Sequence, residues 1–178
     1  TNNLSPSTEY YVKIDATAFD DAAGNSYAGI VDSWGQIGSD IDGEATGDQS
    51  GQSVSLSADG SVVAIGAPLN DGTASNAGHV RVYKNNNGTW TKIGSDIDGE
   101  GYSDYSGWSV SLSADGSVVA ISAIYDDDTA SNAGHVRVYK NVNGTWTKIA
   151  LDIDGEAAHD YSGYSVSLSA DGSVVAIG

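Results

Sequence analysis

Closely spaced carboxylates return along this chain at a constant interval. The stretch Asp40-Ile41-Asp42-Gly43-Glu44 has copies that begin at Asp96 and Asp152, each 56 residues after the one before. Ca²⁺ prefers six to eight oxygen ligands, which alternating carboxylates on a glycine-bent loop can supply. We therefore predict calcium as a cofactor bound once per repeat, although an exposed acidic β-turn would explain the same residues. The predicted ligands are Asp40, Asp42, Glu44, Asp96, Asp98, Glu100, Asp152, Asp154 and Glu156, and Asp48, Asp104 and Asp160 follow at a fixed offset as additional ligands.

Histidine and arginine, which also carry chemistry, follow the same interval. His79 and His135 occupy equivalent positions, and so do Arg81 and Arg137. A catalytic residue has no reason to recur in every repeat, whereas a residue that packs between repeats does. No serine or threonine is paired with a base in a pattern typical of nucleophilic catalysis. We therefore predict no catalytic residues and no enzyme activity.

The composition excludes several classes of partner. Acidic residues outnumber basic residues 24 to 7, and the net charge of −17 repels nucleic acid and anionic membranes. No run of residues approaches the ~18 apolar residues of a membrane span, so we expect no membrane insertion. The chain has no cysteine, which excludes disulfides and thiolate metal sites.

One hairpin sequence sets the expected architecture. Residues 53–65 recur unchanged as residues 109–121 and 165–177. Apolar and polar residues first alternate, as in a strand with one buried face, and Asp59-Gly60 is a strong signal for a tight turn. Residues 62–67 are then apolar on both faces, which is typical of a strand covered on both sides.

The repeat as a whole predicts an all-β fold of β-propeller-type blades. Residues 38–93 and 94–149 are identical at 45 of 56 positions. Each repeat holds four strand candidates, which indicates a four-stranded antiparallel blade. A closed ring needs about 4–8 blades, so the ring is incomplete and other blades of a longer chain are expected partners. We predict a lone strand at 34–37, full repeats at 38–93 and 94–149 and a partial repeat at 150–178, with a core of Val54, Leu56, Val63, Ile65, Val80, Val82 and their counterparts.

The residues flanking the hairpin resemble a known family. Ser50-Gly51 before it and Gly66-Ala67-Pro68 at its end resemble the FG-GAP repeat of integrin α-chain propellers and many bacterial surface proteins, over residues 34–178. Ser50 stands where the family has Phe, and Ser122-Ala123-Ile124 replaces Gly-Ala-Pro in the second repeat. The family's calcium loop lies between the first two strands, where this chain has only residues 58–61. Calcium would therefore have to use the loops of the 40–44 type.

The N-terminal segment resembles a different domain. Residues 4–14 and 21–25 are similar to the last third of a bacterial Ig-like domain of extracellular proteins. Such a sandwich needs ~100 residues. We therefore predict that residues 1–33 are a remnant of such a domain, or a linker.

Two loops account for most of the differences between the repeats. Residues 45–52 correspond to 101–108, and residues 68–72 correspond to 124–128. Variable loops on an invariant scaffold are common recognition sites, and exposed Tyr and Trp are good contact residues. Drift between duplicated repeats would explain the same pattern without a ligand. The candidate contacts to a protein or glycan are Tyr102, Tyr105, Trp108, Tyr125, Asp126, Asp127 and Asp128.

The resemblance implies a non-enzymatic extracellular or cell-surface module for adhesion or ligand binding, stabilised by calcium. Two alternatives stay open. A WD40-like intracellular scaffold propeller shares the strand–Asp-Gly–strand pattern, although the Trp-Asp signature is missing. The chain would also suit the non-catalytic part of a propeller hydrolase.

Overall fold

The computed structural model describes residues 35–178, and these residues form strands and turns without a helix. The predicted Ig-like remnant at 1–33 and Trp34 lie outside the described residues. Residues 35–37, the rest of the predicted lone strand, are not part of a strand. The repeats lie in one unit, Gly38–Gly178, and the architecture below is that of this unit.

The first repeat forms an antiparallel sheet, called blade 1, in the strand order β1-β2-β3-β4 with β5 also paired to β3. β4 pairs with the end of β3, where Tyr83 lies opposite Lys92, and β5 pairs with its start, where Val80 lies opposite Ile97. The outermost position is therefore shared by two short strands. The strands are β1 (Ser53–Leu56), β2 (Val62–Ala67), β3 (His79–Asn86), β4 (Thr89–Lys92) and β5 (Ile97–Asp98).

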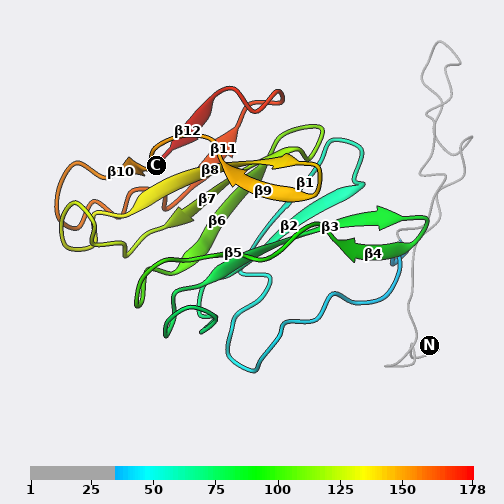
Figure 1. Cartoon of the computed structure of the whole chain (residues 1–178), viewed down its shortest axis with the longest axis horizontal. Coiled ribbons are helices and arrows are strands. Elements are labelled where there is room, and N and C mark those ends of the chain that lie inside the picture. Colours follow the sequence, from blue (N-terminus) through cyan, green and yellow to red (C-terminus); the bar gives the residue numbers. More distant parts are fainter. Residues whose placement is uncertain (1–34) are drawn as a thin grey trace, which may run out of the picture. The chain divides into compact units, whose positions relative to one another are not determined.

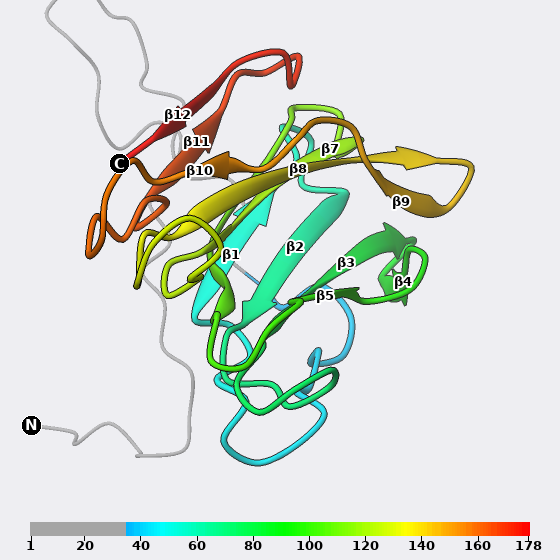
Figure 2. The same cartoon turned by 60° about the vertical axis from the view of Figure 1, so that its left-hand side comes forward.

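The second repeat forms blade 2 with the same arrangement, and a third hairpin follows it. Figures 1 and 2 both show blade 2 between blade 1 and the β11–β12 hairpin, so the three units stack in chain order. The strands are β6 (Ser106–Leu112), β7 (Val118–Ala123), β8 (His135–Val142), β9 (Thr145–Lys148), β10 (Ile153–Asp154), β11 (Val166–Leu168) and β12 (Val175–Ile177).

This architecture confirms the predicted all-β fold with propeller-type blades and an incomplete ring. Residues 96–100 were expected only as a loop to the next repeat, but Ile97–Asp98 is strand β5 of blade 1. The reason is the length of β3, which has eight residues against four in β4. Its first residues would otherwise leave backbone groups unpaired, and the Ile-Asp segment completes that edge.

The Ser-Ala-Asp-Gly-Ser turn closes each hairpin through side-chain hydrogen bonds. In blade 1 the Ser57 hydroxyl donates to Asp59 Oδ1 (2.7 Å), and the Ser61 N–H donates to the same oxygen (2.9 Å). Gly60 takes a φ of 69°, which favours glycine. The Ser61 backbone bond, followed by the Ser57 and Ser61 hydroxyls, lowers the pKa of Asp59 to about 2.

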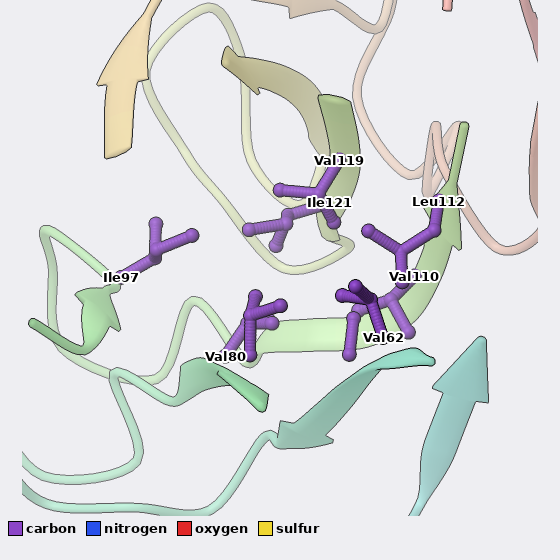
Figure 3. Close-up of a cluster of buried hydrophobic side chains, with 9 residues drawn as sticks. Val62, Val80, Ile97, Val110, Leu112, Val119 and Ile121 are labelled. Atoms are coloured by element: carbon purple, nitrogen blue, oxygen red, sulfur yellow. The ribbon is translucent and has the colours of Figure 1, made fainter. Parts of the chain in front are cut away.

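The main core lies between the two blades. Each blade has a front face, with side chains at the positions of Val110, Leu112, Val119 and Ile121, and a back face. Figure 3 shows the back face of blade 1 and the front face of blade 2 directed into one shared layer. The buried members of this layer are Val62, Ala64, Val80, Val82, Ile97, Val110, Leu112, Val119 and Ile121.

A second layer repeats the same scheme one blade further along. Val118, Ala120, Val136 and Val138 on the back face of blade 2 pack against the hairpin, through Val166, Leu168, Val175 and Ile177. Each blade therefore packs its back face on the front face of the blade that follows.

The predicted core was only partly right. Val63, Val80 and Val82 are buried, but Val54 and Leu56 are 63% and 59% exposed. They lie on the front face of blade 1, and no described blade precedes that face. Val62 and Ala64, which were not predicted as core, are buried on the back face.

Hydrogen bonds from serine hydroxyls and hairpin turns also join successive blades. Ser55 Oγ accepts from the Leu112 N–H (2.9 Å), and Ser111 Oγ accepts from the Leu168 N–H (2.9 Å). The Ala58 N–H donates to the Ala114 carbonyl (2.8 Å) from one turn to the next. These alternating serines therefore face the next blade.

A glycine contact fixes how closely the blades approach. A Cβ on Gly107 would lie 2.6 Å from the His79 carbonyl oxygen and 3.1 Å from Gly66 Cα. No side chain fits at this crossing, so both positions need glycine.

Candidate functional site

The two variable loops meet at one end of each blade. The Leu69 N–H donates to the Asp48 carbonyl (3.2 Å) in blade 1, and the Tyr125 N–H donates to the Asp104 carbonyl (3.3 Å) in blade 2. Nine of the eleven positions at which the repeats differ lie in these loops. We call loops 101–108 and 124–128 the variable end of blade 2.

Three tyrosines form a row at the variable end. The rings of Tyr105 and Tyr125 have centroids 4.9 Å apart at 72°, and those of Tyr125 and Tyr161 are 5.5 Å apart at 79°. Edge-to-face contacts of this kind are favourable for aromatic rings. Tyr161 was not among the predicted contacts, although it stands one period after Tyr105 and that spacing could have identified it.

The other predicted contact residues are divided between this row and other places. Tyr102 is 75% exposed. Trp108 lies in β6 and contacts Tyr164, with ring centroids 5.8 Å apart, rather than the tyrosine row. Asp127 Oδ1 accepts from the Asn132 N–H (2.5 Å), a contact that Asp71 and Asn76 repeat in blade 1. Asp127 therefore shapes its loop.

Beneath the tyrosines, blade 2 buries two carboxylates and an imidazole. Asp104 and Asp126 are 7% and 5% exposed, and His135 is 2% exposed. His135 Nδ1 lies 3.0 Å from Asp126 Oδ1, close enough for an ion pair, but Nδ1 makes no hydrogen bond of good geometry. The Gly101 N–H donates to Asp104 Oδ2 (2.6 Å), and the Asp128 N–H donates to Asp126 Oδ1 (3.1 Å).

Blade 1 has a network with a single carboxylate at the equivalent place. Asp48 Oδ2 accepts from Asn70 Nδ2 (2.8 Å) and from the Ala45 N–H (3.2 Å). Asn70 Oδ1 in turn accepts from the Gly72 N–H (2.8 Å). Blade 2 replaces Asn70 with Asp126 and Gly72 with Asp128, so an amide donor is lost and two carboxylates are gained.

These replacements shift the ionisation of the buried carboxyl groups. Burial raises the pKa of Asp104, and the negative charges of Asp126 and Asp128 raise it further. Burial would also raise the pKa of Asp126, but His135, the Asp128 N–H and Arg137 together outweigh burial and lower that pKa below its usual value. The two carboxyl groups at one site are thus driven in opposite directions.

The predicted calcium loops are joined to the blades by arginine. Asp152 Oδ2 accepts from Arg137 Nε (3.0 Å) and Nη2 (2.9 Å), and Arg137 Nη2 also binds Glu100 (2.6 Å). Arg81 links Glu44 and Asp96 in the same way. Each arginine therefore joins one carboxylate from each of two consecutive loops, a role that the recurrence of Arg81 and Arg137 could have suggested.

This pairing separates the carboxylates of any one loop, because Asp96 and Glu100 bind different arginines. Within residues 35–178, no close group of three candidate metal ligands is formed by one of the predicted calcium loops alone. Calcium binding by the loops stays a prediction. Asp40, Asp42, Asp98, Asp154 and Glu156 are exposed.

Two of these loops each line a shallow pocket, and the two pockets are equivalent. One, of about 320 Å³, is lined by Asp96 and Asp98 together with Tyr139 and Trp146. The other is lined by Asp40 and Asp42 with the matching Tyr83 and Trp90. Trp146 Nε1 donates to the Ile93 carbonyl (2.9 Å), so this tryptophan tethers its strand to the preceding repeat.

Comparison with known proteins agrees with the repeat structure. A family model described as FG-GAP repeat matches residues 40–83 and 95–139, together half of the chain. A search of curated proteins returned no significant match. Each matched segment covers the first two strands of its blade and reaches into the third strand. Since each copy of the repeat forms one antiparallel blade, sequence and fold agree, and the chain belongs to the FG-GAP repeat family.

Proposed function

We propose that this chain is a non-enzymatic ligand-binding module of an extracellular or cell-surface protein, and that the variable end of blade 2 contacts a protein or glycan. One observation carries the proposal. Two otherwise near-identical repeats differ mainly in two loops that lie against each other, and blade 2 gains tyrosines and aspartates there. Recognition residues are commonly placed on loops held by a rigid scaffold.

The chemistry of the variable end suits such contacts. Tyr102 is largely exposed, and Tyr105, Tyr125 and Tyr161 are half-buried. Tyrosine offers contact area at a low cost in conformational entropy. The net charge of −17 favours a ligand that carries positive charge or hydroxyl donors over an anionic one.

Family membership supports the location. FG-GAP repeats are typical of extracellular proteins. None of the described residues forms a helix able to span a membrane. The non-enzymatic role is supported by the contacts of the recurring basic residues, because Arg137 is engaged with Glu100 and Asp152.

Blade 1 supplies the variant that tests this proposal. Tyr102→Thr, Tyr105→Gln and Tyr125→Leu together give blade 2 the residues of blade 1, which form the same sheet. The 178-residue chain would be screened against a printed glycan array and an array of basic peptides. We expect the chain to bind a subset of either array and the triple variant to lose that binding.

The control is Val142→Asn, which also restores a blade 1 residue but lies at the end of β8, outside the variable end. This variant should bind as the unchanged chain does. Binding that survives the triple substitution, or no binding to either array, would contradict the proposal.

A further inference from the structure

The carboxylate cluster of blade 2 has an electrostatic defect that blade 1 lacks. In blade 1 an amide of Asn70 donates to Asp48, so the buried pair holds one charge and one donor. In blade 2 the same two positions hold Asp104 and Asp126, and neither carboxylate can donate when ionised. A buried pair of like charges is costly without a compensating cation.

His135 makes the arrangement more specific. Its side chain is almost fully buried, yet Nδ1 makes no hydrogen bond. A buried polar atom without a partner is destabilising. This nitrogen lies 3.0 Å from Asp126 Oδ1, and Asp128 contributes a second carboxylate to the same group.

The spacing of these atoms matches ligands of one ion. Two atoms bound to the same cation at about 2.1 Å lie about 3.0 Å apart at a right angle and about 3.4 Å apart at the tetrahedral angle. Ligand atoms of Asp126, Asp128 and His135 all lie within 4.8 Å of one another. Asp126 and His135 thus already have the separation of neighbouring ligands.

We propose that blade 2 holds a divalent metal site formed by His135 Nδ1 and the carboxylates of Asp126 and Asp128, with Asp104 beside them. The cation supplies the positive charge that Asp104 and Asp126 lack and the partner that Nδ1 lacks. Asp128 is exposed and leaves a path for the ion from solvent.

The ligand set selects the class of metal. Imidazole nitrogen suits first-row ions such as Zn²⁺ and Mn²⁺, whereas Ca²⁺ takes oxygen ligands. Affinity for a mixed site rises from Mn²⁺ to Zn²⁺. The expected order of affinity is therefore Zn²⁺ over Mn²⁺ over Ca²⁺. The Arg137 guanidinium, the nearby fixed positive charge, is already bound to Glu100 and Asp152.

The combination of two loop aspartates with the histidine occurs only in blade 2 among the described repeats, whereas the equivalent His79 lies near Glu44 and Asp96. Blade 1 has Asn70 and Gly72 at the two key positions. Two of the eleven differences between the repeats therefore place carboxylates at one buried histidine. The inference does not depend on the proposed ligand binding, because its readout is metal uptake alone.

The test is calorimetric titration of the 178-residue chain with Zn²⁺, Mn²⁺ and Ca²⁺ at pH 7. Asp126→Asn restores the blade 1 residue without changing its shape, and Asp127→Asn makes the same charge change in the same loop. We expect one high-affinity Zn²⁺ per chain, at least about tenfold weaker binding after Asp126→Asn, and unchanged binding after Asp127→Asn.

Circular dichroism would establish that both variants keep their β-sheet content. The inference is wrong if the unchanged chain takes up no Zn²⁺, since a proton on Asp104 would then suffice. It is also wrong if both variants weaken binding equally, or if Ca²⁺ binds as tightly as Zn²⁺.

Discussion

The front faces of the two blades have the same sequence and opposite surroundings. Val54 and Leu56 of blade 1 are 63% and 59% exposed, whereas Val110 and Leu112 of blade 2 are each 7% exposed. The hairpins that carry them are identical, and their strands pair in matching registers. Burial at these two positions is therefore decided by the preceding blade and not by the repeat itself.

The largest effect is expected where that comparison is tested directly. Leu112→Ala should destabilise the chain by about 2–5 kcal/mol, because it opens a cavity between the blades. Leu56→Ala should stay within about 0.5 kcal/mol, because Leu56 is exposed. Urea denaturation of both variants measures the difference. Equal losses would mean that the front face of blade 1 is covered in solution.

The close contact at Gly107 allows a second matched pair of variants to be compared. Gly51 and Gly107 are equivalent and have φ values of 93° and 88°, so a new side chain meets the same backbone strain at both. Only at Gly107 would a Cβ also meet the His79 carbonyl. We expect Gly107→Ala to cost about 1–3 kcal/mol more than Gly51→Ala. Thermal melting compares the two, and identical midpoints would argue against the close approach.

The pH dependence of stability should also differ between the two blades, because their buried carboxyl groups have different surroundings. The folded state raises the pKa of Asp104, so below the unfolded-state value of about 3.9 this group has no effect on stability. As the pH rises above that value the unfolded chain ionises first, and stability falls until the folded pKa is passed. Asp104→Asn should remove this fall.

The measurement is the free energy of unfolding between pH 4 and 7 in the presence of a chelator. Asp48→Asn should not give the same relief, because Asp48 accepts a hydrogen bond from Asn70. A pH profile left unchanged by Asp104→Asn would contradict the assigned burial and charge repulsion.

The smallest effect should be the one that all hairpins share. Asp59 and Asp171 have pKa values of about 2, because serine hydroxyls and a backbone N–H bind the charged form. Their contribution is complete above pH ~4 and is lost as the pH falls toward 2. Asp59→Asn and Asp171→Asn should each lower the melting temperature slightly at pH 6 and not at pH 2. A different response at the two turns would show that position along the stack matters here.

The sequence predicts the local elements well because their causes are local. The hairpin follows from alternation around Asp59-Gly60, and the structure confirms it. The layers could not be assigned in the same way. Val62 and Ala64 belong to the core because the next blade covers them, and no pattern within one repeat shows which face meets which neighbour.

The candidate site was predicted less well for a related reason. Asp104, Asp126 and His135 belong to three different segments and meet only because two loops and β8 converge. The available signal was the replacement of Asn70 by Asp126 at an otherwise repeated position. The arginine pairs were missed because Glu100 and Asp152 belong to different repeats.

The serine hydroxyls between the blades give the stack a direction. Ser55 and Ser111 each accept from a backbone N–H of the unit that follows in the chain, on the free edge of its sheet. A strand edge that is occupied in this way is a poor template for pairing with a foreign strand. A foreign strand that approached this edge would have to break the bond to the preceding blade.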